Sequence, residues 1–249
     1  MQNISFIKLS YRFLKTLVSG IFSFIFFLIF IQIFTVLLFV PLFPDNKKQK
    51  LFFKKVLMYY SRFFVFTLFN YKTKVINLNS EKFAKPSVII CNHSSFLDIP
   101  LTLMLIPKLI IFINANILIS PFYLIIRKYV DFYSVSDGVE DNINILKNKV
   151  DEGYSILIFP EGQKNVNNKI SRFHKGAFYI AEMLNLDILP VVIYNKLNYK
   201  INNWLFFKRG IIKMKILKRI SCNDKNYGSD YSKRAKAVGK YFRDEYNSI

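Results

Sequence analysis

The segment Leu17–Phe43 contains no charged residue and is apolar along almost its whole length. A helix needs about 20 apolar residues to cross the hydrocarbon core of a bilayer, so this segment is long enough to enter one. It is too long for the apolar region of a signal peptide, and no small-residue cleavage pattern follows it. We therefore predict a retained, membrane-embedded helical segment that ends near Pro41 and Pro44.

Basic residues flank this segment on both sides. Lys8, Arg12 and Lys15 precede it, and a larger lysine cluster occupies residues 47–55. Because positive charge stays on the cytoplasmic side, two arrangements fit: a span with its C-terminal side in the cytoplasm, or a segment that dips in and returns on one face. We expect a membrane protein with its main domain on the cytoplasmic face.

The next segment, Leu51–Asn70, mixes aromatic residues with Lys54, Lys55 and Arg62. This pattern favours a helix in the headgroup region, with lysine side chains reaching toward lipid phosphates. The alternative is a helix buried against the following domain. We therefore expect residues 1–70 to form a membrane anchor and an interfacial helix, and residues 71–249 to form a separate domain.

Short apolar runs alternate with helical patterns after residue 71. Strands are predicted over residues 87–91, 109–113, 132–135, 155–159 and 188–194, and helices over 99–106, 120–129, 139–150, 175–185 and from 229 onward. Trp204–Phe207 and Ile211–Leu217 resemble a hairpin. This alternation predicts an α/β protein whose sheet is covered by helices on both faces.

The chain has 36 basic and 16 acidic residues, for a formal net charge of +20. An anionic membrane surface and nucleic acid both fit this excess, but the uncharged segment has no role in a nucleic-acid binder, so the membrane is favoured. Cys91 and Cys222 lack paired spacing, and the chain has only two histidines. Neither a disulfide framework nor a metal site is expected.

The apolar run 88–91 ends in Asn92-His93, and Asp98 lies five positions after the histidine. A turn can bring Asp98 back to the imidazole, where a carboxylate fixes the tautomer and stabilises the protonated ring. His93 is therefore a candidate general base. The alternative is a helix-capping aspartate beside a structural histidine. Ser94 and Ser95 lack a nucleophile elbow, so one of them is expected to cap the helix instead.

A second polar cluster ends the apolar strand over residues 155–159. Pro160 interrupts strand pairing, Gly162 permits a close backbone approach, and Glu161 and Lys164 add charge. Because ligands bind at the carboxyl ends of strands in α/β sheets, we expect this cluster and His93 to face one cleft.

Together these motifs resemble the 1-acylglycerol-3-phosphate acyltransferase family of glycerolipid acyltransferases. "NHSSFLD" resembles its His-x4-Asp signature, and "FPEGQK" resembles its Phe-Pro-Glu-Gly-Thr-Arg block. "RFHKGAF" and "ILPVVI" resemble its later Lys-Gly and Pro-Val blocks, in the expected order. The resemblance covers roughly residues 70–220 and implies a glycerolipid-acyltransferase-like mixed sheet.

The resemblance implies transfer of a fatty acyl group from acyl-CoA or acyl-carrier protein to a lysophospholipid or another hydroxylated lipid. It implies no metal, no cofactor and no covalent acyl-enzyme. His93 would be the general base, and Asp98 would orient it. The backbone near Asn92 or Gly162 would stabilise the oxyanion. The implied substrate-binding residues also include Lys164 and Lys175, which would hold an anionic head group, and Glu161, which would position Lys164 or bind the acceptor.

Two departures from the family pattern concern the acceptor. Gln163-Lys164 replaces Thr-Arg, and lysine lacks the bidentate fork of arginine. The intervening stretch "KYVDFYSVSDG" has no arginine at the matching place, and Arg127 comes too early. A lipid without a phosphate head group is therefore an alternative acceptor. A lipid or thioester hydrolase and a non-catalytic membrane module remain alternatives, and product analysis separates them.

Overall fold

The computed structural model describes residues 46–67, 71–95, 97–113, 130–134, 139–164, 169–196 and 210–248, with a few positions between 11 and 21. Most of Leu17–Phe43, the predicted helix over 120–129 and Trp204–Phe207 lie outside these residues. Within the described part of the chain, no helix combines the length and apolar character needed to cross a bilayer.

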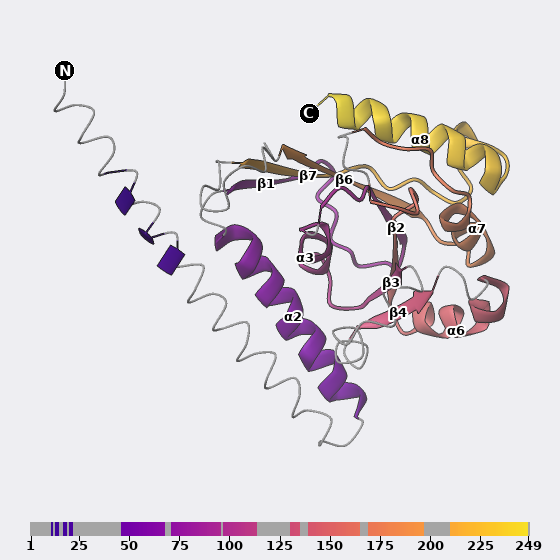
Figure 1. Ribbon diagram of the computed structural model, residues 1–249. Helices are drawn as coiled ribbons and strands as arrows, with labels where there is room; N and C mark the ends of the chain where they lie inside the picture. Colours follow the sequence, from indigo (N-terminus) through magenta and orange to yellow (C-terminus); the bar gives the residue numbers. More distant parts are fainter. Residues whose placement is uncertain are drawn as a thin grey trace.

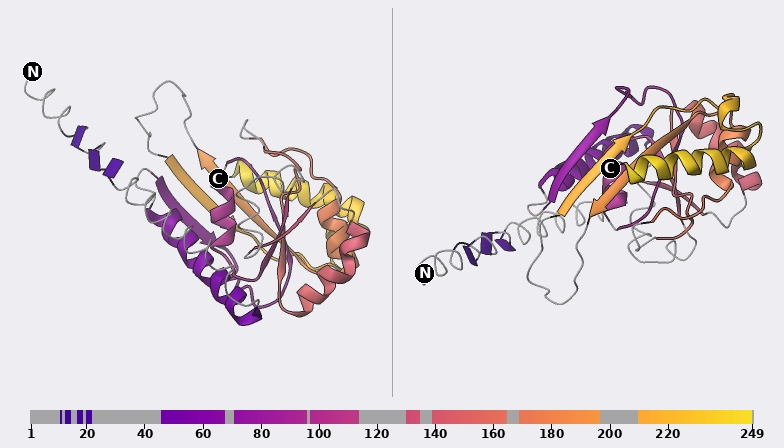
Figure 2. Two further views of the ribbon diagram at one scale, coloured as in Figure 1. Left: turned by 60° about the horizontal axis from the view of Figure 1, so that its bottom comes forward. Right: turned by 90° about the horizontal axis from the view of Figure 1, so that it is seen from above.

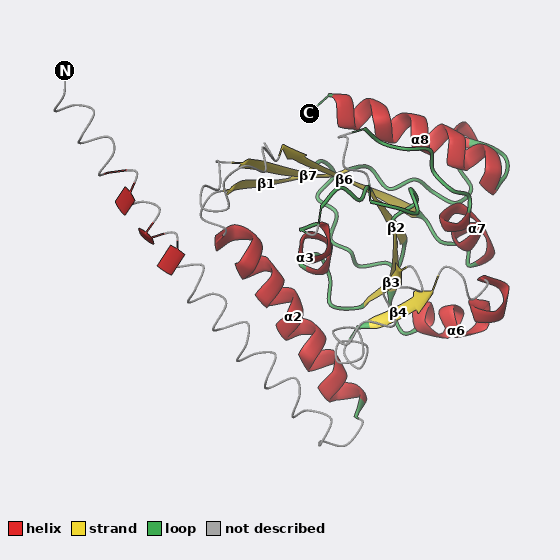
Figure 3. Cartoon of the chain, viewed as in Figure 1, coloured by secondary structure: helices red, strands yellow, loops and turns green. Residues whose placement is uncertain are grey.

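Helices and strands alternate along most of the chain (Figures 1 and 3). The elements are α2 (Lys47–Thr67), β1 (Tyr71–Asn77), β2 (Val88–Cys91), α3 (Asp98–Leu103), β3 (Leu109–Ile113), β4 (Asp131–Ser134), α6 (Val139–Asp151), β5 (Ser155–Ile158), α7 (Gly176–Met183), β6 (Ile188–Lys196), β7 (Gly210–Ile216), a 3-10 turn (Lys225–Tyr227) and α8 (Tyr231–Asn247). The predicted α/β class is confirmed.

The strands form one mixed sheet in the order β1-β7-β6-β2-β5-β3-β4. All neighbours are parallel except β6 and β7, which are antiparallel. The predicted hairpin between Trp204–Phe207 and Ile211–Leu217 includes residues outside the described part of the chain. Both edges of β7 are already paired, with β1 on one side and β6 on the other. Both of these partners come from earlier in the chain.

Side chains of the central strands alternate between two apolar cores. In β2, Val88 and Ile90 join the core beneath α6, α7 and α8, whereas Ile89 and Cys91 face the core beneath α2 and α3. This follows from the two-residue period of a strand. Two views of the molecule show helices on both faces of the sheet, as predicted (Figure 2). Each fully buried isoleucine contributes roughly 2 kcal/mol of burial free energy.

One side of helix α2 packs against the sheet, and another side of this helix exposes apolar residues. Val65 is buried, and Leu57 and Phe64 pack against the core beneath α2 and α3. The exposed side is a row of large apolar residues, which we call the α2 apolar stripe: Phe52, Val56, Tyr59, Phe63 and Phe66. Their spacing of four and three residues places them along one helix face.

Lys54 corrects one expectation for α2. The sequence pattern predicts a lysine that reaches toward lipid, but the Lys54 side chain is buried. Its Nζ pairs with the Asp131 carboxylate and donates a 3.0 Å hydrogen bond to the hydroxyl of Tyr154. A buried ammonium requires such partners. Lys54 therefore joins α2 to β4 and to the residue that precedes β5.

Candidate active site

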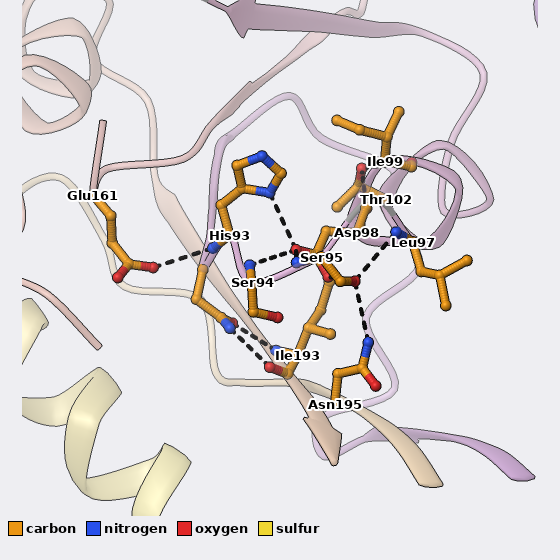
Figure 4. Close-up of polar contacts among 11 residues, drawn as sticks. His93, Ser94, Ser95, Leu97, Asp98, Ile99, Thr102, Glu161, Ile193 and Asn195 are labelled. Carbon is orange, nitrogen blue, oxygen red and sulfur yellow. Dashed lines mark hydrogen bonds and ion pairs between the residues drawn. The ribbon is translucent and has the colours of Figure 1, made fainter. Parts of the chain in front are cut away.

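The structure brings His93 and Asp98 together through the turn between β2 and α3. Nδ1 of His93 lies 3.1 Å from Oδ2 of Asp98. Asp98 is fully buried, whereas the imidazole is 25% exposed. Because an ionised carboxylate only accepts hydrogen bonds, Nδ1 carries the proton. The lone pair of Nε2 is then left facing away from the carboxylate (Figure 4).

Four donors surround the Asp98 carboxylate. Oδ2 accepts hydrogen bonds from the backbone N–H groups of Ser94 and Ser95, at 2.6 and 2.7 Å, as well as from His93. Oδ1 accepts the Ser95 hydroxyl at 3.0 Å. These bonds offset the cost of burying a carboxylate and fix its direction. Asp98 is thus held with one oxygen aimed at the imidazole.

Asn195 on β6 extends this arrangement. Its Nδ2 donates to Ser95 Oγ at 3.1 Å, so Asn195, Ser95, Asp98 and His93 form one hydrogen-bonded series, which we call the His93 network (Figure 4). Sequence reasoning missed Asn195, although a polar residue within an apolar strand is a detectable signal. The expected serine cap is also wrong, because Leu97 occupies the N-cap of α3 and Ser95 Oγ accepts its N–H instead.

Asn92 holds the end of β2 against β6. Its Nδ2 donates to the carbonyl of Ile193, and its Oδ1 accepts the N–H of the same residue, both at 2.8 Å. Asn92 is almost fully buried. These two bonds fix the strand end from which His93 emerges, and a role for Asn92 in substrate binding stays a prediction.

Glu161 joins the two predicted motifs. This buried carboxylate accepts the backbone N–H of His93 through Oε1 at 3.1 Å and that of Ser171 through Oε2 at 2.8 Å. Phe159, two residues earlier, packs its ring against the imidazole with centroids 4.6 Å apart. The ends of β2 and β5 therefore meet, as predicted. Glu161 ties loops together in this structure, and contact with a substrate is not tested.

Gly162 cannot be replaced without strain. Its φ is +70°, and a Cβ there would lie 3.0 Å from Cδ2 of His174. The tight turn also leaves few free backbone donors. The N–H of Gly162 bonds to Phe159, that of His93 to Glu161, and those of Ser94 and Ser95 to Asp98. None of these four N–H groups is free to act as an oxyanion donor.

Cys91 directly precedes Asn92 and His93, but its thiol is unreactive. It is fully buried, and burial, reinforced by the negative charges of Asp98 and Glu161, raises the pKa of its thiol well above the ordinary value. The thiolate is the nucleophilic form of cysteine. Cys91 is therefore a core residue, as expected.

The two predicted cationic residues are exposed. Lys164 follows the Gly162 turn, and Lys175 occupies the N-cap of α7. Lys175 borders a pocket formed with α8. The binding of an anionic head group by Lys164 and by Lys175 stays a prediction.

A histidine paired with a buried aspartate at the carboxyl edge of a mixed sheet is the arrangement that the sequence motifs implied. Residues 72–194 match the sequence model of the family described as Acyltransferase. This part of the chain therefore carries an acyltransferase domain, and the class of protein that it indicates is that of the acyltransferases.

Its curated relatives are 1-acyl-sn-glycerol-3-phosphate acyltransferases. The human beta enzyme is 27% identical over 143 residues, or 55% of this chain and 51% of that protein. The Saccharomyces cerevisiae enzyme is 29% identical over 152 residues, or 55% and 48%. The Borreliella burgdorferi enzyme is 33% identical over 125 residues, or 50% and 42%. The chain thus spans about half the length, or less, of these relatives.

A solved structure shares the fold. The crystal structure of PlsC, the 1-acyl-sn-glycerophosphate acyltransferase of Thermotoga maritima, superposes with a TM-score of 0.71. The superposition covers 95% of this chain and 97% of that chain at 20% sequence identity.

Proposed function

We propose that the protein is a membrane-bound O-acyltransferase. It moves a fatty acyl group from a thioester, acyl-CoA or acyl-carrier protein, to a hydroxyl of a lysophospholipid or a related lipid. The observation that carries this proposal is the His93–Asp98 pair, with Nδ1 engaged by a buried carboxylate and Nε2 left to act as a base.

The mechanism needs one proton transfer in each direction. Nε2 of His93 takes the proton of the acceptor hydroxyl as that oxygen attacks the thioester carbonyl carbon. The tetrahedral intermediate collapses, the carbon–sulfur bond breaks, and the leaving thiolate takes the proton from the imidazolium. Asp98 stabilises the imidazolium between these steps. General base catalysis of this kind contributes roughly 10²–10⁴-fold to the rate.

The α2 apolar stripe supports attachment to a membrane. An amphipathic helix that exposes phenylalanines binds at the boundary between head groups and acyl chains. Phe159, which packs against the His93 ring, belongs to the same side of the sheet as α2 and α3. A lipid acceptor held in the membrane would thus approach His93 from the α2 side, with residues 71–249 on the cytoplasmic face.

An assay of the full chain in lipid nanodiscs tests the proposal. Acyl-CoA and acyl-carrier protein are offered with a panel of lysolipids, including lysophosphatidic acid and a monoacylglycerol, and products are identified by mass spectrometry. We expect an acylated acceptor. We expect His93→Ala to lower kcat by at least about 10³-fold without changing vesicle binding.

His174→Ala is the matched control because it removes the other histidine of the chain. It should retain most of the activity. Release of free fatty acid without an acylated acceptor would identify a hydrolase instead. Near-normal activity of His93→Ala would remove His93 from the mechanism.

A further inference from the structure

A basic pocket lies between α8 and the loop that precedes α7, outside the His93 network. Four cationic side chains line it together with a hydroxyl, and Phe173 also contributes to its wall. The polar lining residues are Arg172, Lys175, Ser232, Lys236 and Arg243. We call it the α8 pocket. Its volume of about 90 Å³ has room for a phosphate-sized group, and no carboxylate lines it.

The charges of the α8 pocket are not neutralised by the protein. Elsewhere, Arg219 pairs with Glu81, and Lys215 pairs with Glu245. Within the described residues, none of the four pocket cations forms an ion pair. Converging like charges repel one another, and a bound anion removes that repulsion while accepting charge-assisted hydrogen bonds.

Backbone geometry adds to the positive field. Lys175 occupies the N-cap of α7 and provides no side-chain cap, so that helix end carries an unsatisfied partial positive charge beside the pocket. The space around Gly176 is open. On α8, the Nη1 of Arg243 lies 3.5 Å from the place where a Cβ of Gly239 would sit. This guanidinium therefore folds back along the helix.

The position of the pocket favours a water-soluble ligand. Helices α7 and α8 cover the sheet face opposite α2, so the pocket lies away from the α2 apolar stripe (Figure 1). It is nevertheless close to the His93 loop. Arg172 follows Ser171, whose N–H bonds to Glu161, and Glu161 also bonds to the His93 backbone. These links keep the backbones of Arg172 and His93 within about 15 Å of each other.

We propose that the α8 pocket binds the phosphate of the phosphopantetheine arm of the acyl donor. This inference rests on the proposed acyl transfer. Coenzyme A and acyl-carrier protein both carry this phosphate, so the pocket serves either donor. On this assignment Lys175 contacts the donor and not the acceptor head group. With the phosphate held by α8, the arm passes the Glu161 turn and presents its thioester to His93.

Steady-state kinetics of pocket variants test this assignment. Lys236→Ala and Arg243→Ala each remove one pocket cation, and Lys240→Ala removes an exposed cation from the same helix outside the pocket. Each variant is assayed with acyl-CoA, acyl-carrier protein and acyl-pantetheine, a thioester without the phosphate. We expect the KM for both phosphorylated donors to rise about tenfold in the pocket variants.

The kcat, the KM for the acceptor and the KM for acyl-pantetheine should change by less than about twofold. The Lys240→Ala enzyme should resemble the wild type throughout. A rise confined to acyl-CoA would contradict the proposal, because acyl-carrier protein carries the same phosphate. Equal effects on acyl-pantetheine, an effect on the acceptor KM instead, or a similar loss in Lys240→Ala would overturn the proposal.

Titration of free coenzyme A into the full chain, followed by calorimetry, separates this inference from the proposed function. Binding that weakens in Lys236→Ala but not in Lys240→Ala supports the pocket even if no acyl transfer is observed. If the wild type transfers acyl groups and His93→Ala does not, but the pocket variants bind coenzyme A normally, the pocket assignment fails and the proposed function stands.

Discussion

Asn195 and Ser95 are joined by a 3.1 Å hydrogen bond from the Asn195 amide to the Ser95 hydroxyl oxygen. This contact connects β6 to the loop that carries His93 and Asp98. Ser95 in turn donates to Asp98, so the direction of the Asp98 carboxylate depends on a residue that no substrate need touch.

We therefore expect Asn195→Ala to lower kcat by about tenfold while the KM values change little. Without its amide, Ser95 is free to rotate and Asp98 loses part of its fixed orientation. The measurement is steady-state kinetics with a thermal unfolding curve for each protein. An unchanged kcat with a lowered melting temperature would show that Asn195 serves stability alone.

Ser94 and Ser95 offer a matched pair of substitutions. Ser95 Oγ joins Asn195 to Asp98, whereas the buried Ser94 Oγ has no hydrogen-bond partner among the described residues. Ser95→Ala should reduce kcat and destabilise the protein by about 1–2 kcal/mol, because it leaves buried polar groups unpaired. Ser94→Ala should keep its activity and stability. Similar losses in both variants would contradict the described network.

The stability of the protein should depend on pH through Glu81. Burial alone would raise the pKa of this carboxyl, but hydrogen bonds from Arg219 and from the Phe83 N–H lower the pKa below its ordinary value. A lowered pKa in the folded state adds stability above the unfolded pKa of about 4.3. That contribution is lost as the pH falls through the lower, folded value.

Urea unfolding of the full chain in detergent can measure this effect. Glu81→Gln should be less stable than the wild type near about pH 7, and the difference should shrink at a pH below the ordinary carboxyl pKa. Arg219→Ala should remove the same pH-dependent contribution to the free energy of unfolding. A difference between wild type and Glu81→Gln that stays constant across this range would refute the assignment.

The α2 apolar stripe should determine part of the membrane affinity. Phe63 and Phe66 are both more than half exposed, so each could transfer apolar surface into lipid. Replacing each with Ser should weaken vesicle binding by about fivefold, measured by co-sedimentation. Ile145→Ser is the control because Ile145 is an exposed apolar residue of α6, on the other face of the sheet. Equal losses in the control would indicate nonspecific adsorption.

Local patterns in the sequence were sufficient to predict the contact between His93 and Asp98. His93 and Asp98 are five residues apart, and a single turn after an apolar run brings them together. The strand Leu109–Ile113 was equally clear because its apolar residues are continuous. Features of this kind depend on neighbours in the chain, which the sequence displays directly.

Other features depend on residues that are distant in sequence. The local sequence predicts that Lys54 faces lipid, because its partners Asp131 and Tyr154 lie far away in the chain. The role of Asn195 requires the register of β6 beside β2. The α8 pocket combines the loop before α7 with a helix near residue 236. The periodicity of apolar residues predicts which face of a helix or strand is buried. It does not predict which other element packs against that face.

The place of β1 in the sheet has a consequence for biosynthesis. β1 forms an edge of the sheet, and its register pairs Tyr71 with Gly210. During translation, β1 leaves the ribosome long before β7, and an unpaired strand edge recruits other chains. Completion of this edge is therefore a late event, and the nascent protein is most exposed to aggregation while α2 is already available to the membrane.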